Sequence, residues 1–239
     1  MVQTWWARRG VIAVCTLLLV ACGSAGAVGT NGAAEAATGA DDARSYARRA
    51  AAQLEVEALP GTDGGAFAGR DLDLPLATPD FVLTDTAGRP FDFRRDATTP
   101  VTLVYFGYTS CPDVCPAHMA AISSAISRLP AAQADDVQVL FVSVDAVNDT
   151  PERLRAYLAN FDPDFVGLTG TADEVNGALA SVGLPPTAIS SESDFPPQHP
   201  SDVLAYTADG RAHVVYPFGS KPSAYARDLP ALIDADWAA

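Results

Sequence analysis

Two runs of apolar residues, at 101–106 and 137–144, constrain the fold of this 239-residue chain more than any other feature. The first run, VTLVYF, is β-branched and aromatic, which is typical of a buried strand. The second run, VQVLFVSV, has the same character. Between them, residues 117–129 repeat apolar side chains at helical spacing. The centre of the chain therefore predicts a strand, a helix and a second buried strand.

Shorter patterns predict the remaining elements. These are two strands at 81–83 and 91–93 around a turn, a helix from Thr150 and Pro151 to about 161, a strand at 165–168, a helix at 172–182, a hairpin of strands at 203–206 and 213–216, and a final helix at 222–236. This order implies an α/β protein with a mixed central sheet flanked by helices. The thioredoxin-like fold has this layout, and it places its chemistry at the N-terminus of the helix after the first core strand.

The N-terminal residues resemble a bacterial export signal. Arg8 and Arg9 precede an apolar run at 11–20, which is shorter than the roughly 20 residues that a membrane span needs. Residues 19–22, LVAC, resemble a lipobox, in which cleavage leaves a cysteine as the lipid-carrying N-terminus. We therefore expect Cys22 to be lipidated. The alternative is an ordinary signal peptide that is cleaved nearby, with Cys22 incidental.

This interpretation divides the chain into three parts. We expect a lipoprotein signal peptide at 1–21, a lipidated and largely flexible tether at 22–71, and the folded domain at 72–239. The domain would then lie at the outer face of the cytoplasmic membrane, held by its lipid anchor. Cys111 and Cys115 would be the two free thiols of the mature chain, in a compartment that permits disulfides.

The composition limits the chemistry further. Hydrophobic residues make up 49% of the chain and charged residues 18%, which excludes a wholly disordered protein. Twenty-nine acidic and fifteen basic residues give a net charge of −14, so nucleic acid is not expected as a partner. The chain contains only three histidines and four cysteines. Any metal or redox site must therefore be built from very few residues.

The pair Cys111 and Cys115 carries the strongest chemical signal. The two residues lie between a predicted strand and a predicted helix, and Pro116 suits the first turn of that helix. The helix N-terminus favours a thiolate and lowers the pKa of a cysteine there. The sulfurs are suited to form a disulfide when oxidised, or to act as two soft ligands when reduced. A purely stabilising disulfide is the alternative, but so short a loop constrains the unfolded chain little.

A third ligand would make this pair a metal site. His199 lies just before the predicted strand at 203–206, whose start faces the cysteine loop in a thioredoxin-like layout. Two thiolates and an imidazole suit copper, whereas structural zinc usually takes four protein ligands. His118 follows Cys115 by one helical turn and is a rival ligand, with a surface or supporting role as the preferred interpretation. We interpret His213 as structural.

Several segments together resemble the Sco/SenC family of copper-binding assembly factors. They are PDFVLTD at 79–85, FGYTSCPDVCP at 106–116, VSVD at 142–145, DTPE at 149–152, NFDP at 160–163 and GLTG at 167–170. Each is a weak signal alone, but in this order and with the cysteine motif they are highly specific. The resemblance covers about residues 72–236.

The resemblance implies a membrane-tethered, thioredoxin-like domain that binds copper through Cys111, Cys115 and His199. Family members deliver copper to the binuclear copper site of cytochrome c oxidase, or keep the cysteines of that site reduced for loading. The expected partners are the copper-site subunit of the oxidase and other copper carriers or thiol reductants. In the family the histidine usually follows Val-Asp, whereas here residues 197–198 are Pro-Gln. Asp113 is a candidate for tuning the site or contacting a partner.

Three functions remain open from the sequence. A copper chaperone requires both thiols and His199, and it transfers its ion by ligand exchange. A thiol–disulfide oxidoreductase requires Cys111 and Cys115 as a redox pair but not the histidine. A peroxide-reducing enzyme requires one of the cysteines as the attacking thiolate. The three-residue spacing and the candidate third ligand favour copper. Asp145, at the end of a strand, is interpreted either as orienting a nearby loop or as an ordinary strand-end residue.

Overall fold

The computed structural model describes residues 61–187 and 199–237, all of which belong to one compact unit. The predicted signal peptide, Cys22 and most of the predicted tether lie outside the described residues. Within the part of the chain that the structure describes, no helix has both the length and the apolar character needed to cross a membrane.

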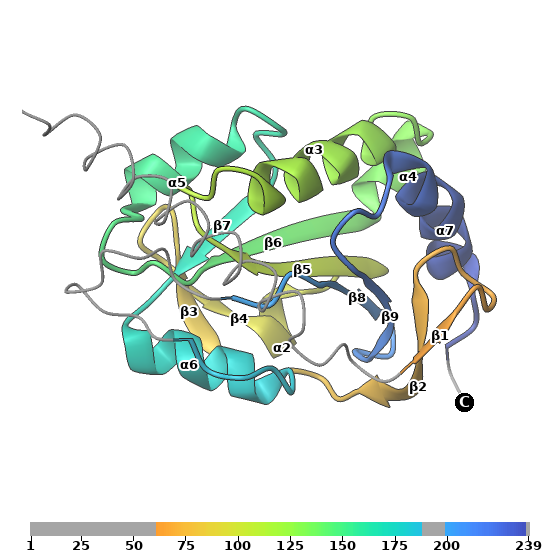
Figure 1. The fold of residues 1–239 in the computed structure, drawn as a ribbon, viewed down its shortest axis with the longest axis horizontal. Coiled ribbons are helices and arrows are strands. Elements are labelled where there is room, and N and C mark those ends of the chain that lie inside the picture. Colours follow the sequence, from red (N-terminus) through yellow and green to blue (C-terminus); the bar gives the residue numbers. More distant parts are fainter. Residues whose placement is uncertain (1–60, 188–198, 238–239) are drawn as a thin grey trace, which may run out of the picture. The chain divides into compact units, whose positions relative to one another are not determined.

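The described elements follow one another in the order shown in Figure 1. They are β1 (Gly61–Asp63), β2 (Arg70–Leu76), β3 (Val82–Asp85), β4 (Pro90–Asp92), α2 (Phe93–Asp96), β5 (Val101–Gly107), α3 (Val114–Ile126), α4 (Ala131–Asp135), β6 (Val137–Ser143), α5 (Pro151–Leu158), β7 (Val166–Thr169), α6 (Ala172–Ser181), β8 (Val203–Thr207), β9 (Ala212–Tyr216) and α7 (Pro222–Asp234).

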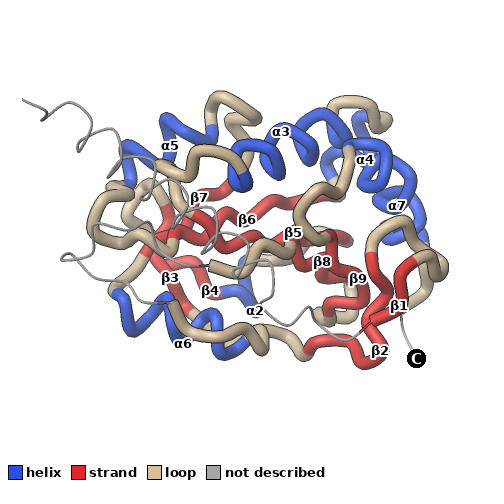
Figure 2. Tube along the Cα trace, viewed as in Figure 1, coloured by secondary structure: helices blue, strands red, loops and turns tan. Residues whose placement is uncertain are grey.

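A single nine-stranded sheet organises these elements, with the strand order β1-β2-β9-β8-β5-β6-β7-β3-β4. Strands β5, β6 and β7 are parallel, and the remaining pairs are antiparallel. The sheet is therefore mixed, as the sequence predicts. Helices α3, α5 and α7 cover one face, while α2 and α6 cover the other (Figure 1). The strands run between these two groups of helices in Figure 2.

The central strands are buried because both faces of the sheet are covered. All seven residues of β5 are buried, and so are the last five of β6. This burial accounts for the continuous apolar character of the two runs that dominate the sequence. The parallel pair β5–β6 is joined through α3 and α4, as a crossover between parallel strands requires. The fold thus places the α3 N-terminus directly after a rigid, buried strand.

Helices α5 and α6 both begin with side-chain caps, of which only the cap of α5 is predicted above. The side chain of Thr150 caps α5, and Pro151 occupies its first turn. Thr171 and Glu174 form a reciprocal capping box at the start of α6. Both α5 and α7 end a few residues before the ends predicted from the sequence. The short helices α2 and α4 were not predicted, because four or five residues carry too little periodicity to be recognised.

The boundary predicted at residue 72 is too late. Residues 61–71, which the sequence assigns to the tether, contain β1 and the first part of β2. Strand β2 pairs with β9, so this segment is an integral edge of the sheet. Glycine and aspartate dominate the segment and hide any strand pattern. Its conformation is set by partners that are distant in the sequence.

The main partner is Asp228, a buried carboxylate on α7. It accepts hydrogen bonds from the backbone N–H groups of Ala68 and Gly69, each at 2.8 Å, and from the hydroxyl of Tyr216 at 3.3 Å. Charge-assisted bonds of this kind are stronger than neutral ones. Asp228 therefore fixes the entry into β2 against α7 and β9.

Candidate metal centre

The two cysteines lie where the central strand meets a helix. Strand β5 ends at Gly107, Cys111 lies in the following loop, and Cys115 occupies the first turn of α3. Cys111 is 8% exposed and Cys115 is fully buried. The backbone N–H of Cys115 donates to the sulfur of Cys111 at 3.4 Å. The helix N-terminus thus directs a donor at one sulfur, as expected for a thiolate site.

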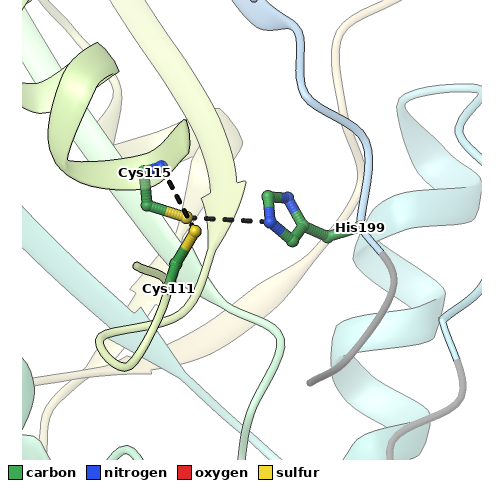
Figure 3. Close-up of side chains that lie close together, drawn as sticks. All are labelled: Cys111, Cys115 and His199. Carbon is green, nitrogen blue, oxygen red and sulfur yellow. Dashed lines mark hydrogen bonds between the residues drawn. The ribbon is translucent and has the colours of Figure 1, made fainter. Parts of the chain in front are cut away.

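His199 lies close to the two cysteines because it precedes β8, the neighbour of β5 in the sheet. Strand β8 runs antiparallel to β5 and pairs Val203 with Tyr105, so the residues before β8 lie beside the end of β5. Figure 3 shows the imidazole ring directed at the two sulfurs. Nε2 of His199 lies 3.7 Å from Sγ of Cys115. The ligand atoms of Cys111, Cys115 and His199 all lie within 4.8 Å of one another.

The orientation of His199 is fixed by its own backbone neighbour. Nδ1 lies 2.8 Å from the carbonyl oxygen of Pro200, which makes Nδ1–H the donor and leaves the lone pair of Nε2 facing the sulfurs. Metal-binding histidines usually donate their second nitrogen to such an acceptor. The carbonyl of Pro200 thus provides the acceptor for this ring, although Pro197 and Gln198 replace the Val-Asp of the family. Rings of Tyr105 and Tyr108 contact the imidazole edge-on, with centroids at 6.0 and 5.4 Å.

The two sulfurs differ in their proton affinity. Hydrogen bonds from the thiol and the backbone N–H of Cys115 and from the backbone N–H of Asp113 hold the pKa of the Cys111 thiol well below its usual range. Burial, followed by the hydrogen bond and negative charge of Cys111, raises the pKa of the Cys115 thiol far above its usual range. The pair therefore carries one negative charge and one proton near neutral pH.

A buried carboxylate holds the cysteine loop in place. Asp149, which is 1% exposed, accepts hydrogen bonds from both the backbone N–H and the hydroxyl of Thr109, and from the hydroxyl of Ser143. Arg153 adds bonds to the hydroxyls of Thr109 and Ser110. Sequence reasoning missed this role, although Asp149 lies in the DTPE segment. Its signal in the sequence was a carboxylate directly before Thr150, the N-cap of α5.

Position 107 requires glycine because Cys115 and Tyr105 approach its backbone closely. A Cβ atom at this position would lie 2.9 Å from Sγ of Cys115 and 2.8 Å from a ring carbon of Tyr105. Both distances are shorter than a van der Waals contact. The absence of a side chain at the end of β5 therefore provides the space in which the Cys115 sulfur lies.

The other residues considered from the sequence have separate places. His118 is buried on α3 between Tyr105 and Phe218, with ring centroids at 5.0 and 6.0 Å, and burial lowers the pKa of its imidazole to about 4. It is not in the ligand cluster, so it is a buried supporting residue rather than a surface one. His213 pairs with Asp209 at 2.9 Å, away from the site.

The two aspartates near the site also differ. Asp113 is exposed and precedes α3 without a side-chain cap, while its backbone N–H supports Cys111. Asp145 accepts hydrogen bonds from the side chain of Asn148 and thereby orders the loop between β6 and α5. The first interpretation of Asp145, that it orients a loop, therefore fits its contacts.

Comparison with known proteins places this geometry in a family. A profile of the SCO1/SenC family matches residues 71–234. Mitochondrial SCO2 of Saccharomyces cerevisiae is 40% identical over 95 residues, which cover 40% of this chain and 31% of that protein. SenC of Rhodobacter capsulatus is 39% identical over 104 residues, covering 44% of this chain and 46% of that protein. The chain thus spans less than half the length of these two relatives.

The fold agrees with solved structures of the same group. The structure of Bradyrhizobium japonicum ScoI with copper bound is 31% identical, with a TM-score of 0.56, and the match covers 66% of this chain and 99% of that one. The solution structure of apo Sco1 from Thermus thermophilus is also 31% identical, with a TM-score of 0.59 over 72% of this chain and 99% of that one. Because the family profile covers well over half of the 239 residues and the fold agrees, this chain belongs to the SCO1/SenC family.

Proposed function

We propose that this protein is a copper chaperone that holds one copper ion through Cys111, Cys115 and His199 and delivers it during assembly of the binuclear copper site of cytochrome c oxidase. The observation that carries the proposal is the convergence of three ligand atoms, from a loop, a helix and a strand start, within 4.8 Å of one another. The ion is cargo here, since a chaperone has to release what it binds.

The donor set suits copper better than other metals. Thiolates select Cu(I), and imidazole accommodates both copper oxidation states. A structural zinc site usually takes four protein ligands. Among the described residues, the cluster supplies three donors. The copper-bound ScoI structure from Bradyrhizobium japonicum, with its similar fold, supports the same assignment.

The geometry accounts for binding that is both specific and reversible. His199 is oriented by Pro200, and Cys111 already carries a negative charge, so copper displaces a single proton, from Cys115. Cys115 is fully buried, whereas His199 is partly exposed. A receiving thiolate therefore approaches the ion from the side of His199 and Cys111 and replaces these ligands by exchange.

The proposed cellular setting follows from the N-terminal sequence. Lipidation of Cys22 would hold the domain at the outer face of the cytoplasmic membrane, where the copper-site subunit of the oxidase is its recipient. Several acyl chains on one residue anchor a protein firmly. Membrane fractionation of the wild-type chain and a Cys22→Ser variant tests this: the wild type is expected in the membrane fraction and the variant in the soluble extract. Equal membrane retention of both would contradict the lipid anchor.

A thiol–disulfide oxidoreductase is the second candidate, and one observation favours it. The thiolate of Cys111 lies beside the protonated, buried thiol of Cys115, which is the asymmetry that a nucleophile and a resolving cysteine need. Cys111 would attack a disulfide of the oxidase subunit, and Cys115 would then break the mixed disulfide. The target gains two electrons, and the chain is left with a Cys111–Cys115 disulfide.

An anaerobic titration with Cu(I) separates the two functions. The sample is the chain from residue 22 onward with Cys22→Ser, because truncation at 72 would remove β1 and part of β2. Native mass spectrometry counts the ions, and a competing chelator reports affinity. We expect one bound copper, and for His199→Ala a loss of about a hundredfold in affinity, since one of three ligands is missing. His213→Ala is the matched control.

The results of this titration distinguish the chaperone from the oxidoreductase. Weakened binding in His199→Ala with unchanged binding in His213→Ala supports the three-ligand chaperone. Absence of tight copper in the wild type, with the cysteines still cycling to a disulfide, would reject the chaperone and favour the oxidoreductase.

A further inference from the structure

A tyrosine hydroxyl is directed at one of the two sulfurs from inside the core. Tyr105 lies on β5, fully buried, and its hydroxyl donates a hydrogen bond to Sγ of Cys115 at 3.4 Å. Sulfur is a large, soft acceptor, so its hydrogen bonds are longer than those to oxygen. Neither proposed function assigns a role to this residue.

The tyrosine ring is held on several sides. It packs against His118 from α3 and Phe141 from β6, with ring centroids at 5.0 and 5.8 Å, and against the ligand His199 at 6.0 Å. Gly107 leaves open the space that the ring and the sulfur of Cys115 share. The hydroxyl is therefore fixed by packing, and it does not need the sulfur to define its position.

The hydroxyl remains a donor throughout the working pH range. Burial, together with the charges of the two sulfurs, raises the pKa of Tyr105 well above its usual range. A phenol that keeps its proton donates to the sulfur whether that sulfur is a thiol, a thiolate or a metal ligand.

The two sulfurs receive different donors. Sγ of Cys111 accepts from backbone N–H groups at the helix start, which no side-chain substitution removes. Sγ of Cys115 accepts from Tyr105, whose hydroxyl a single conservative substitution removes. The site thus offers a way to change the electron density of one sulfur without altering any ligand.

We infer that Tyr105 is a positioning residue that withdraws electron density from the sulfur of Cys115, and so sets both the reduction potential of the Cys111–Cys115 pair and the preference of the site for Cu(I) over Cu(II). The copper half of this inference rests on the proposed function; the thiol half does not. Hydrogen bonds to sulfur ligands tune the potentials of copper and iron–sulfur centres in the same sense.

The direction of the effect follows from which form the bond stabilises. Reduction by two glutathione molecules breaks the Cys111–Cys115 S–S bond, forms glutathione disulfide and transfers two electrons to the protein sulfurs. Of the two protons that glutathione gives up, one stays on Cys115 and the other is released to solvent, because Cys111 remains a thiolate. In the reduced form the Cys115 thiol donates a hydrogen bond to the Cys111 thiolate, which makes the Cys115 sulfur a better acceptor than a disulfide sulfur, so Tyr105 favours the reduced form. A couple whose reduced form is stabilised is the more oxidising one.

The test compares Tyr105→Phe with Tyr206→Phe in the chain from residue 22 onward carrying Cys22→Ser, in which Cys111 and Cys115 are the only cysteines. Tyr206 is a buried tyrosine of β8 whose hydroxyl has no hydrogen-bond partner among the described residues, which makes it a matched loss of one buried oxygen. For Tyr105→Phe we expect the equilibrium constant for reduction by glutathione to fall about tenfold, or about 30 mV for two electrons. For Tyr206→Phe we expect no change.

A second modification reverses the sign. Incorporating 3-fluorotyrosine at position 105 by codon suppression keeps the ring and makes its hydroxyl a stronger donor. The same equilibrium constant is then expected to rise above the wild-type value. In the Cu(II)-loaded protein, the sulfur-to-copper charge-transfer band should move to lower energy in Tyr105→Phe and to higher energy with fluorotyrosine, because the hydrogen bond lowers the energy of the sulfur donor orbitals.

Opposite shifts from the two changes at position 105, with Tyr206→Phe unmoved, support the inference. A wild-type equilibrium constant in both position-105 proteins would overturn it, as would an equal shift in Tyr206→Phe. If Tyr105→Phe does not fold, the sign of the fluorotyrosine shift decides. If the wild type binds no tight copper, the proposed chaperone function fails, while the glutathione equilibrium still decides the role of Tyr105.

Discussion

Two buried carboxylates fix two different regions of this protein in the same way. Asp149 binds the backbone of the cysteine loop and two hydroxyls, while Asp228 binds the backbone before β2 and one hydroxyl. Each is 1% exposed. One region carries the candidate metal ligands and the other an edge of the sheet. An anchored loop is therefore not evidence of function in itself. The first region is distinguished by the soft donors that its anchor positions.

Loss of a cysteine ligand is expected to have the largest effect on Cu(I) affinity, and a substitution in the other region almost none. Replacing Cys115 with alanine removes one of two soft ligands, and we expect Cu(I) affinity to fall by about a thousandfold or more. Competition titration against a Cu(I) chelator measures this. Asp228→Ala is the control outside the site, and we expect it to retain affinity within a few-fold. Tight binding by Cys115→Ala would place the ion elsewhere.

The matched pair Asp149→Ala and Asp228→Ala tests the comparison itself. Each variant leaves backbone N–H groups and a hydroxyl without their acceptor, so we expect each to lower the free energy of unfolding by about 3 kcal/mol. Only Asp149→Ala releases the cysteine loop, and we expect it also to weaken Cu(I) binding by about tenfold. Denaturant unfolding and chelator competition on the same samples give both quantities. Equal losses of affinity in the two variants would show that general stability, rather than the loop anchor, governs binding.

Alanine substitutions at two glycines, one in each region, compare the effect of steric crowding on copper binding. A Cβ at Gly107 would press on the sulfur of Cys115, and a Cβ at Gly69 would lie 2.5 Å from a methyl group of Val214. Overpacking of this kind costs about 1–3 kcal/mol of unfolding free energy in each alanine variant. Gly107→Ala is expected to weaken Cu(I) binding as well, whereas Gly69→Ala is not. Unchanged copper affinity in a folded Gly107→Ala protein would mean that the sulfur has room to move.

The smallest expected effect is a pH slope within the site. Because the pKa of Cys111 is lowered and that of Cys115 is raised, one proton leaves on copper binding at pH 7–8. Cu(I) affinity should therefore rise about tenfold per pH unit in that range. Two ordinary thiols, both protonated at pH 7, would give a slope near a hundredfold per unit. Competition titrations at several pH values measure this slope. A slope near a hundredfold per pH unit would contradict a site in which Cys111 is already a thiolate and Cys115 alone carries a proton.

The sequence predicted the parts of this protein that depend on local pattern. The buried strands β5 and β6, the cap at Thr150 and the cysteine motif each carry their signal within a few residues. The convergence of His199 on the cysteines was predicted from the expected fold and the resemblance together.

The remainder depends on contacts between distant residues. The N–H groups of residues 68–69 are bonded by Asp228, which lies about 160 positions later. In the sequence, Tyr105 has the pattern of an ordinary buried aromatic residue of a strand. Its hydroxyl gains a hydrogen-bond partner through the close approach of Cys115 in the fold. The acceptor for the second nitrogen of His199 is a backbone carbonyl, which no side-chain motif reveals.

X-ray absorption spectroscopy of the anaerobic, Cu(I)-loaded chain identifies the sulfur and nitrogen ligands of the bound ion. We predict a three-coordinate ion with two sulfur ligands and one nitrogen ligand in the wild type, and loss of the nitrogen ligand in His199→Ala. Copper bound by sulfur alone in the wild type, or a nitrogen ligand that persists in His199→Ala, would contradict the assignment of His199 as the third ligand.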